Sequence, residues 1–290
     1  MSTIAESVTP EQFEQYILPY LTTAKRGYVS KTPLVGIFNL ILYRLHTGCQ
    51  WDCLPVSKDA QERQQRNEPS WQAVYGHWQQ WSADGSLERV WQQSILSIQE
   101  KLDLQQMNLD GSHAIAKKGG ESVAYQARKR AKTSNSLPIT DRHGYLVAST
   151  GIVAGNHNDA FNLKPHLQQA FKAMKGLGLT IAGALFNADS AFDTKEARKV
   201  CFNHQVVPNM AENKRNRKTI KRGRKRLFNA EVYKVRFVSE RSFAWIDKFR
   251  ALLVRFDLKD ANFLAGHHLA FALINLRHLF ASTRPASSTL

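Results

Sequence analysis

One long amphipathic stretch, residues 233–257, constrains the fold of this chain most strongly. On a helix, its apolar side chains fall along one stripe, made of Val235, Val238, Trp245, Ile246, Phe249, Leu252, Leu253 and Phe256. The opposite face carries Tyr233, Arg236 and Glu240, and the last two lie one turn apart, where they can pair. The pattern predicts a single long helix against a core. Aromatic side chains beside the Arg–Glu pair predict that the second face is covered too; the alternative is a surface salt bridge on a half-exposed helix.

Capping signals and helical spacing of apolar residues predict that residues 1–102 form a helical region. A capping sequence opens a helix after Thr9, and a second, apolar helix is ended by Gly48. Within residues 71–81, Trp and Val side chains recur at helical spacing, which favours a core stripe over a base-stacking surface. Two roles stay open for this region, a helix-turn-helix reader of DNA and a packing or dimerisation module.

The periodicity changes after Leu102, where short strands replace helices. One apolar strand ends at Asp110 and another at Asp189, and two antiparallel strands lie between 137 and 154. The stretch 117–132 is basic, contains glycine and is predicted to be a loop. This part of the chain is therefore α/β. Asp-Gly is also a favoured hairpin turn, so a structural role for Asp110 is an alternative to catalysis.

The charge of the chain points to a polyanionic partner. Forty Lys and Arg residues against 24 Asp and Glu leave a net charge of +16. Nucleic acid is favoured over an anionic membrane, and a solvated basic surface is the alternative. The densest basic run predicts phosphate contact, or else a disordered solvated loop. It consists of Lys214, Arg215, Arg217, Lys218, Lys221, Arg222, Arg224, Lys225 and Arg226.

Composition indicates a folded protein within the cell. Hydrophobic residues make up 43% of the chain and aromatic residues 10%, enough for a sizeable core. No apolar run of 18 residues occurs, which argues against a spanning helix. The N-terminus has neither the basic start nor the apolar core of a secretory signal.

Three acids distant in sequence suggest a metal site. If adjacent parallel strands place Asp110 beside Asp189, and the helix that carries Glu240 packs near that edge, the three carboxylates converge. Alone they would repel and raise one another's pKa. A divalent cation such as Mg²⁺ removes that repulsion. Two such ions, about 4 Å apart, can activate the attacking hydroxyl and stabilise the leaving oxygen of an in-line phosphoryl displacement.

The same residues resemble a known family. The signature Tyr-x2-Arg-x3-Glu (Tyr233, Arg236, Glu240), LDGSH around Asp110 and NADSAFD around Asp189 are similar to motifs of the DDE transposases of bacterial insertion sequences. The helical stretches FNLILYRLHTGCQWDCLP and SWQAVYGHWQQWSADGSLERVW resemble the region that precedes the catalytic domain in one branch of that group. The resemblance runs from about residue 33 to 280 and combines several separate motifs.

The resemblance implies a ribonuclease H-like catalytic domain over residues 103–280, after a helical region over 1–102 and before a disordered tail over 281–290. It implies that Asp110, Asp189 and Glu240 are the catalytic metal ligands. Tyr233 and Arg236 would support them near the DNA. The family often has Lys seven residues after the Glu, where this chain has Asp247, so no DNA contact is carried over to the neighbouring Lys248.

The function implied is a transposase that cuts DNA at the inverted-repeat ends of its own element and joins the freed 3′ hydroxyls to target DNA. Two Mg²⁺ ions would serve the reaction, with Mn²⁺ as a substitute, and water would be the first nucleophile. Double-stranded DNA, a homo-oligomer formed on it and a cytoplasmic, nucleoid-associated location in a bacterium are expected, with no membrane partner. The alternatives are an inactive or repurposed DNA-binding protein and a metal-dependent nuclease that cuts without joining.

Overall fold

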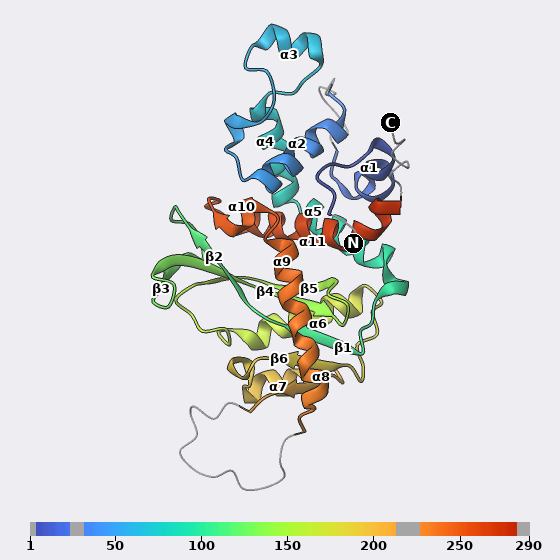
Figure 1. The fold of residues 1–290 in the computed structure, drawn as a ribbon, viewed down its shortest axis with the longest axis vertical. Coiled ribbons are helices and arrows are strands. Elements are labelled where there is room, and N and C mark those ends of the chain that lie inside the picture. Colours follow the sequence, from blue (N-terminus) through green and yellow to red (C-terminus); the bar gives the residue numbers. More distant parts are fainter. Residues whose placement is uncertain (1–3, 24–31, 213–226, 283–290) are drawn as a thin grey trace, which may run out of the picture. The chain divides into compact units, whose positions relative to one another are not determined.

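A computed structural model of the protein describes residues 4–23, 32–212 and 227–282 (Figure 1). The chain divides into two compact units. The helical unit contains residues 1–98 and 245–290, and the second unit, which we call the sheet unit, contains residues 99–244. None of the helices in the described ranges is long and apolar enough to cross a membrane.

The helical unit is built from short helices and one long one. Its elements are α1 (Pro10–Tyr16), η1 (Leu18–Tyr20), α2 (Leu34–Thr47), η2 (Trp51–Cys53), α3 (Ala60–Arg66), α4 (Trp71–Ala83), α5 (Ser86–Ser97), α10 (Arg250–Leu253), β8 (Val254–Arg255) and α11 (Asp260–Ser282). The predicted helix signals are confirmed, because Thr9 and Gln12 form a capping box at α1 and Gly48 ends α2 in the left-handed conformation.

The core of the helical unit forms where α11 packs against α4 and α5. Trp78 and Trp81 of α4 are fully buried, which confirms that the tryptophan stripe is core. Trp91 of α5 stacks on His268 of α11, with ring centroids 4.9 Å apart. Burial lowers the pKa of His268 to about 3, so this ring packs as a neutral group.

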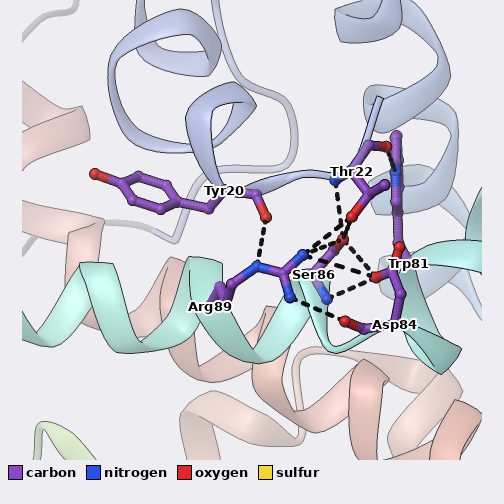
Figure 2. Close-up of polar contacts among 6 residues, drawn as sticks. All are labelled: Tyr20, Thr22, Trp81, Asp84, Ser86 and Arg89. Carbon is purple, nitrogen blue, oxygen red and sulfur yellow. Dashed lines mark hydrogen bonds and ion pairs between the residues drawn. The ribbon is translucent and has the colours of Figure 1, made fainter. Parts of the chain in front are cut away.

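A polar cluster fixes the segment after η1 to the turn between α4 and α5 (Figure 2). The Arg89 guanidinium donates to the carbonyl of Tyr20 at 3.2 Å and to the hydroxyl of Thr22 at 3.1 Å. The Ser86 hydroxyl accepts from the Thr22 N–H at 3.0 Å, and the Trp81 indole donates to the Thr22 carbonyl at 3.0 Å. Backbone groups that lack a helical partner are thereby satisfied.

The sheet unit consists of a mixed sheet and the helices that pack on it. Its elements are η3 (Gln99–Lys101), β1 (Gln106–Leu109), β2 (Ser112–Ala116), β3 (Ala124–Gln126), β4 (Ala131–Asp141), β5 (Leu146–Ala154), α6 (Leu163–Gly176), β6 (Leu185–Ala188), η4 (Ser190–Phe192), α7 (Lys195–Asn203), β7 (Val207–Met210), α8 (Ala230–Lys234), η5 (Val235–Phe237) and α9 (Val238–Ile246). The division assigns the last two residues of α9 to the helical unit.

The strands of the sheet unit lie in the order β5-β4-β1-β6-β7. β4 is antiparallel to β5 and β1, whereas β1, β6 and β7 run parallel. Helix α6 packs against β5, and α7 against β7. Three antiparallel strands followed by two parallel ones are the ribonuclease H-like arrangement, which confirms the predicted fold class.

β1 and β2 form one line of chain against β4, interrupted at Asp110. The register is the same on both sides, since Leu109 pairs with Ile139 and Ser112 with Ser136. In this register Pro138 falls opposite Asp110. Proline has no N–H to donate, so the ladder breaks at this point. The acid therefore lies within the central line of the sheet, not at the end of a lone strand.

The prediction of one long helix over residues 233–257 is wrong. The segment contains part of α8, then η5, α9, α10 and β8, and the α-helix stops after Ile246. Phe249 caps α10 with non-helical backbone angles and is fully buried against His46, with ring centroids 4.5 Å apart. Because the chain unwinds to bury Phe249, the predicted stripe does not continue: Leu253 and Phe256 are exposed.

Two further boundaries differ from the sequence analysis. The stretch 117–132, predicted to be a loop, contains β3 and the start of β4. Residues 245–280, which the sequence analysis grouped with the catalytic domain, cluster with the helical unit, because α11 packs on α4 and α5. Residues 281 and 282 end α11, and the remainder of the predicted tail lies outside the described ranges.

Candidate active site

Asp110 and Asp189 lie side by side on neighbouring parallel strands. The β1–β6 register pairs Asn108 with Asn187 and Leu109 with Ala188, so each aspartate follows the last paired residue of its strand. Adjacent strands are about 4.8 Å apart. Each carboxylate also accepts the backbone N–H of the next residue, Gly111 or Ser190. The structure thus brings these two predicted site residues together.

Arg236 supplies the positive charge beside this pair. Its Nη1 donates to Asp110 Oδ2 at 2.9 Å, and both side chains are one-quarter exposed. Arg236 was expected to pair with Glu240, one turn along the helix, so this contact corrects that expectation. The arginine reaches Asp110 because α8, η5 and α9 run across the sheet in Figure 1.

Asp110 carries an electrostatic cost. Burial raises its pKa, and the nearby carboxylates of Asp189 and Asp159 raise it further, whereas Arg236 and the Gly111 N–H lower it. The net shift is upward, so one arginine does not balance the site. A bound cation would relieve the remaining repulsion.

The backbone at Gly111 lies close to side chains of β4. A Cβ added to Gly111 would lie 3.1 Å from the Leu137 side chain and 3.2 Å from the Asn135 amide oxygen. Both contacts are tighter than ordinary packing. Glycine therefore lets β4 approach the acid-bearing line closely.

Tyr233 and Glu240 extend from the same helical segment as Arg236. The Arg236 guanidinium lies 5.6 Å from the centre of the Tyr233 ring. Burial raises the pKa of Tyr233, and Asp189 and Asp110 add to that shift, which sets the phenol near both acids. Glu240 lies in the first turn of α9 and is exposed. No group of three or more His, Cys, Asp or Glu side chains able to hold a metal occurs within the described residues.

A row of buried asparagines underlies the carboxylates. Asn187 donates to Asn108 Oδ1 at 2.9 Å, and Asn209 donates to Asn187 Oδ1 at 2.7 Å. Asn209 also bonds both backbone groups of Asn229, the residue whose side chain caps α8. We call these residues, 108, 187, 209 and 229, the asparagine ladder.

The ladder connects both strands to the helical segment that carries Arg236. Asn108 and Asn187 each precede a site aspartate by two residues, so they share its face of the sheet. The sequence analysis missed the ladder, although a repeated Asn-x-Asp pattern, at Asp110 and again at Asp189, signals it.

A second polar group lies next to Asp110 and was also missed. Asn135 of β4 donates to Asp159 Oδ1 at 2.9 Å, and His113 Nε2 lies 3.7 Å from the same oxygen. The neighbouring His113 ring is the main cause that lowers the pKa of Asp159. Asp159 lies 24 residues beyond Asn135 in the sequence, and only the fold brings it to β4.

The predicted basic run, residues 214–226, lies outside the described residues. Its predicted contact with DNA therefore stays a prediction. The positive charge that the structure does describe at the site comes from Arg236.

Comparison with known proteins gives two family matches. Residues 8–91 match a family described as "Putative transposase of IS4/5 family", and residues 94–276 match the "Transposase DDE domain". The second match alone spans more than half of the chain. The chain belongs to the DDE transposase family.

Solved structures give only distant likenesses. The "Mos1 transposase paired-end complex with left transposon end" is 9% identical, with a TM-score of 0.31, over 91% of this chain and 83% of that one. The "Crystal structure of a pre-cleavage Mos1 transpososome" is 10% identical, with a TM-score of 0.24 and the same coverage. None of the curated proteins matches the chain significantly.

As a DDE transposase, the protein is an enzyme that cuts and transfers DNA. Enzymes of this family use divalent metal ions. Hard carboxylate oxygens, such as the neighbouring pair of Asp110 and Asp189, are the ligands that such ions prefer. The residues at this edge of the sheet therefore fit the cation that the family requires.

Proposed function

We propose that this transposase cleaves DNA at the inverted-repeat ends of its own insertion sequence and joins the 3′ hydroxyl ends to target DNA. The observation that carries the proposal is the side-by-side position of Asp110 and Asp189, with Arg236 bonded to the first. Two adjacent carboxylates and one arginine form a small centre able to hold a phosphodiester through cation and guanidinium contacts.

Asp110, Asp189 and Glu240 are the proposed metal ligands, and Mg²⁺ is the proposed metal, with Mn²⁺ as a substitute. When bound, a pair of such ions lowers the pKa of attacking water and stabilises the leaving oxygen. Two of these acids are adjacent in the structure. The third is assigned from the family signature, and its place one turn beyond Arg236 supports that assignment.

Arg236 and Tyr233 act on the DNA in this proposal. The guanidinium offers donors beyond the one that Asp110 uses, and these suit a phosphate oxygen. Water attacks the phosphodiester at the element end and frees a 3′ hydroxyl. That hydroxyl then attacks a target phosphodiester, so one P–O bond forms as another breaks and no covalent protein intermediate is needed.

Joining two ends requires both to be held together, so we propose that a homo-oligomer forms on the DNA. The basic run at 214–226 would supply further phosphate contacts. Because the substrate is chromosomal DNA, the protein would act at the bacterial nucleoid. Light scattering of the complex with end DNA tests the assembly, and a mass that corresponds to one subunit would contradict it.

The test uses purified protein, Mg²⁺ and DNA that carries the repeats flanking the gene. Wild-type protein should nick at the repeat end. Asp110→Asn and Asp189→Asn should each reduce nicking about 10³-fold, equivalent to about 4 kcal/mol of transition-state stabilisation, while DNA binding persists. Glu196→Gln removes one exposed acid from α7 and serves as the control.

The outcomes separate three functions. Nicking followed by joining supports the transposase. Nicking without joining would identify a nuclease of the same fold. Binding of the ends without cleavage would identify a DNA-binding protein that has lost catalysis.

A further inference from the structure

The stretch 117–132, which we call the basic arm, extends from the line of chain that carries Asp110. It contains one acid, Glu121, and six cations: Lys117, Lys118, Arg128, Lys129, Arg130 and Lys132. All six are exposed. Within the described residues, Lys129 is the one of the six whose side chain makes a hydrogen bond, to the carbonyl of His113 at 2.9 Å, and none of the six side chains forms an ion pair there.

The arm is a defined part of the sheet, not a solvated loop. β3 pairs with the start of β4, with Tyr125 opposite Lys132. The Ser134 hydroxyl donates to the carbonyl of Ser122 at 2.7 Å. Gln126 Nε2 lies 3.1 Å from His113 Nε2, on the strand that begins two residues after Asp110. Like charges are thus held together against their mutual repulsion.

The turn at the tip of the basic arm contains a residue in an unfavourable backbone conformation. Arg130 closes it in the left-handed region, with φ of 49°, and donates its N–H to the Ala127 carbonyl at 3.2 Å. A non-glycine residue with this backbone conformation is strained. Such local strain is typical of functional segments.

We propose that the basic arm binds the phosphates of duplex DNA beside the cleavage centre. Six residues of extended chain separate Asp110 from Ala116, a distance of about 20 Å. The backbone of one DNA strand advances about 3.4 Å per nucleotide, so the arm would meet phosphates about six nucleotides from the bond that is cut. This inference rests on the proposed function and adds a second contact surface to it.

The test compares two quadruple variants that remove equal charge. In the arm variant, Lys117, Lys118, Arg128 and Lys132 become Gln. In the control, Gln replaces Lys164, Lys172, Lys175 and Lys199, four exposed cations of α6 and α7. Affinity of the full chain for a random-sequence 30-bp duplex is measured in EDTA, across a range of salt concentrations.

The arm variant should bind about 100-fold more weakly at low salt. The slope of log affinity against log salt should fall by about three to four, because each lost phosphate contact removes about one unit. The control should stay close to the wild type. Equal losses in the two variants would overturn the proposal, as would a wild type that binds no duplex.

Two controls separate a loss of DNA binding from misfolding and from a failure of the proposed function. Thermal melting checks both variants. If the arm variant fails to fold, Arg128→Gln and Lys132→Gln are measured singly against Lys172→Gln, with a slope change of about one expected for each arm residue. Because binding is measured without metal, failure of cleavage would leave the arm result standing. If both variants bind DNA equally well and cleavage is intact, the proposal for the basic arm fails and the proposed transposase function is unaffected.

Discussion

The two units of this transposase each place an aspartate beside an arginine, and the two pairs differ in their effect. In the helical unit, burial acts to raise the pKa of Asp84, but hydrogen bonds from Ser86 and Thr22 and the charge of Arg89 outweigh it, so the net pKa is lowered. In the sheet unit, burial and two neighbouring carboxylates outweigh Arg236, and the pKa of Asp110 is raised.

The difference separates stabilising polar groups from functional ones. A lowered carboxyl pKa means that folding favours the charged form, whereas a raised one means that folding disfavours it. The Asp84 cluster therefore contributes to stability, and the Asp110 site detracts from it. Such a site persists only where its surroundings fix it, and the asparagine ladder provides that support.

The largest expected effect comes from breaking the ladder in the middle. Asn187→Leu leaves the buried Asn108 oxygen without its donor and should cost about 3 kcal/mol of unfolding free energy. Cleavage per folded molecule should also fall, because the strand that carries Asp189 loses its register constraint. Chemical denaturation and nicking assays measure the two effects.

A double variant sharpens that result. Asn108→Leu with Asn187→Leu removes the orphaned acceptor together with its donor, so its cost should be less than the sum of the single costs. Simple additivity would mean that the two asparagines do not act as a pair, and the ladder would then be packing alone.

A smaller effect is expected in the helical unit. Ser86→Ala removes the acceptor for the Thr22 N–H and should cost about 1–2 kcal/mol, with cleavage per folded molecule unchanged. Ser97→Ala in the same helix is the control, since Ser97 bonds only the Gln93 carbonyl one turn back. A loss of cleavage beyond the folded fraction would contradict the division between the two clusters.

Much of the fold could be predicted from local signals. Capping sequences, the tryptophan stripe and short apolar strands that end in an acid depend on neighbours in sequence, and they fixed the helical region and the adjacency of Asp110 and Asp189. These features need only helical or strand periodicity to be read correctly.

The features that sequence reasoning missed depend on contacts across the fold. Arg236 pairs with Asp110 instead of Glu240 because the sheet brings a more buried carboxylate within reach. Phe249 ends a helix that periodicity would continue, since its burial outweighs local propensity. Asp159 joins the site through Asn135, on a strand 24 residues away, and through His113.

The smallest expected effect tests the direction of the pKa shift of Asp84, which distinguishes the Asp84–Arg89 pair from the Asp110–Arg236 pair. Asp84→Asn removes a carboxylate whose folded-state pKa lies below its ordinary value of 3.8. The stability that it contributes is therefore present above that pH and is lost as the pH falls through the folded-state pKa. The variant should be less stable than the wild type by less than about 1 kcal/mol at pH 7, and the two should converge as the pH falls below about 4. Thermal melting between pH 3 and 7 measures this, with Glu88→Gln, an exposed acid in the first turn of α5, as the control. A difference that grows toward low pH would reverse the sign assigned to Asp84 and remove the distinction between the two aspartate–arginine pairs.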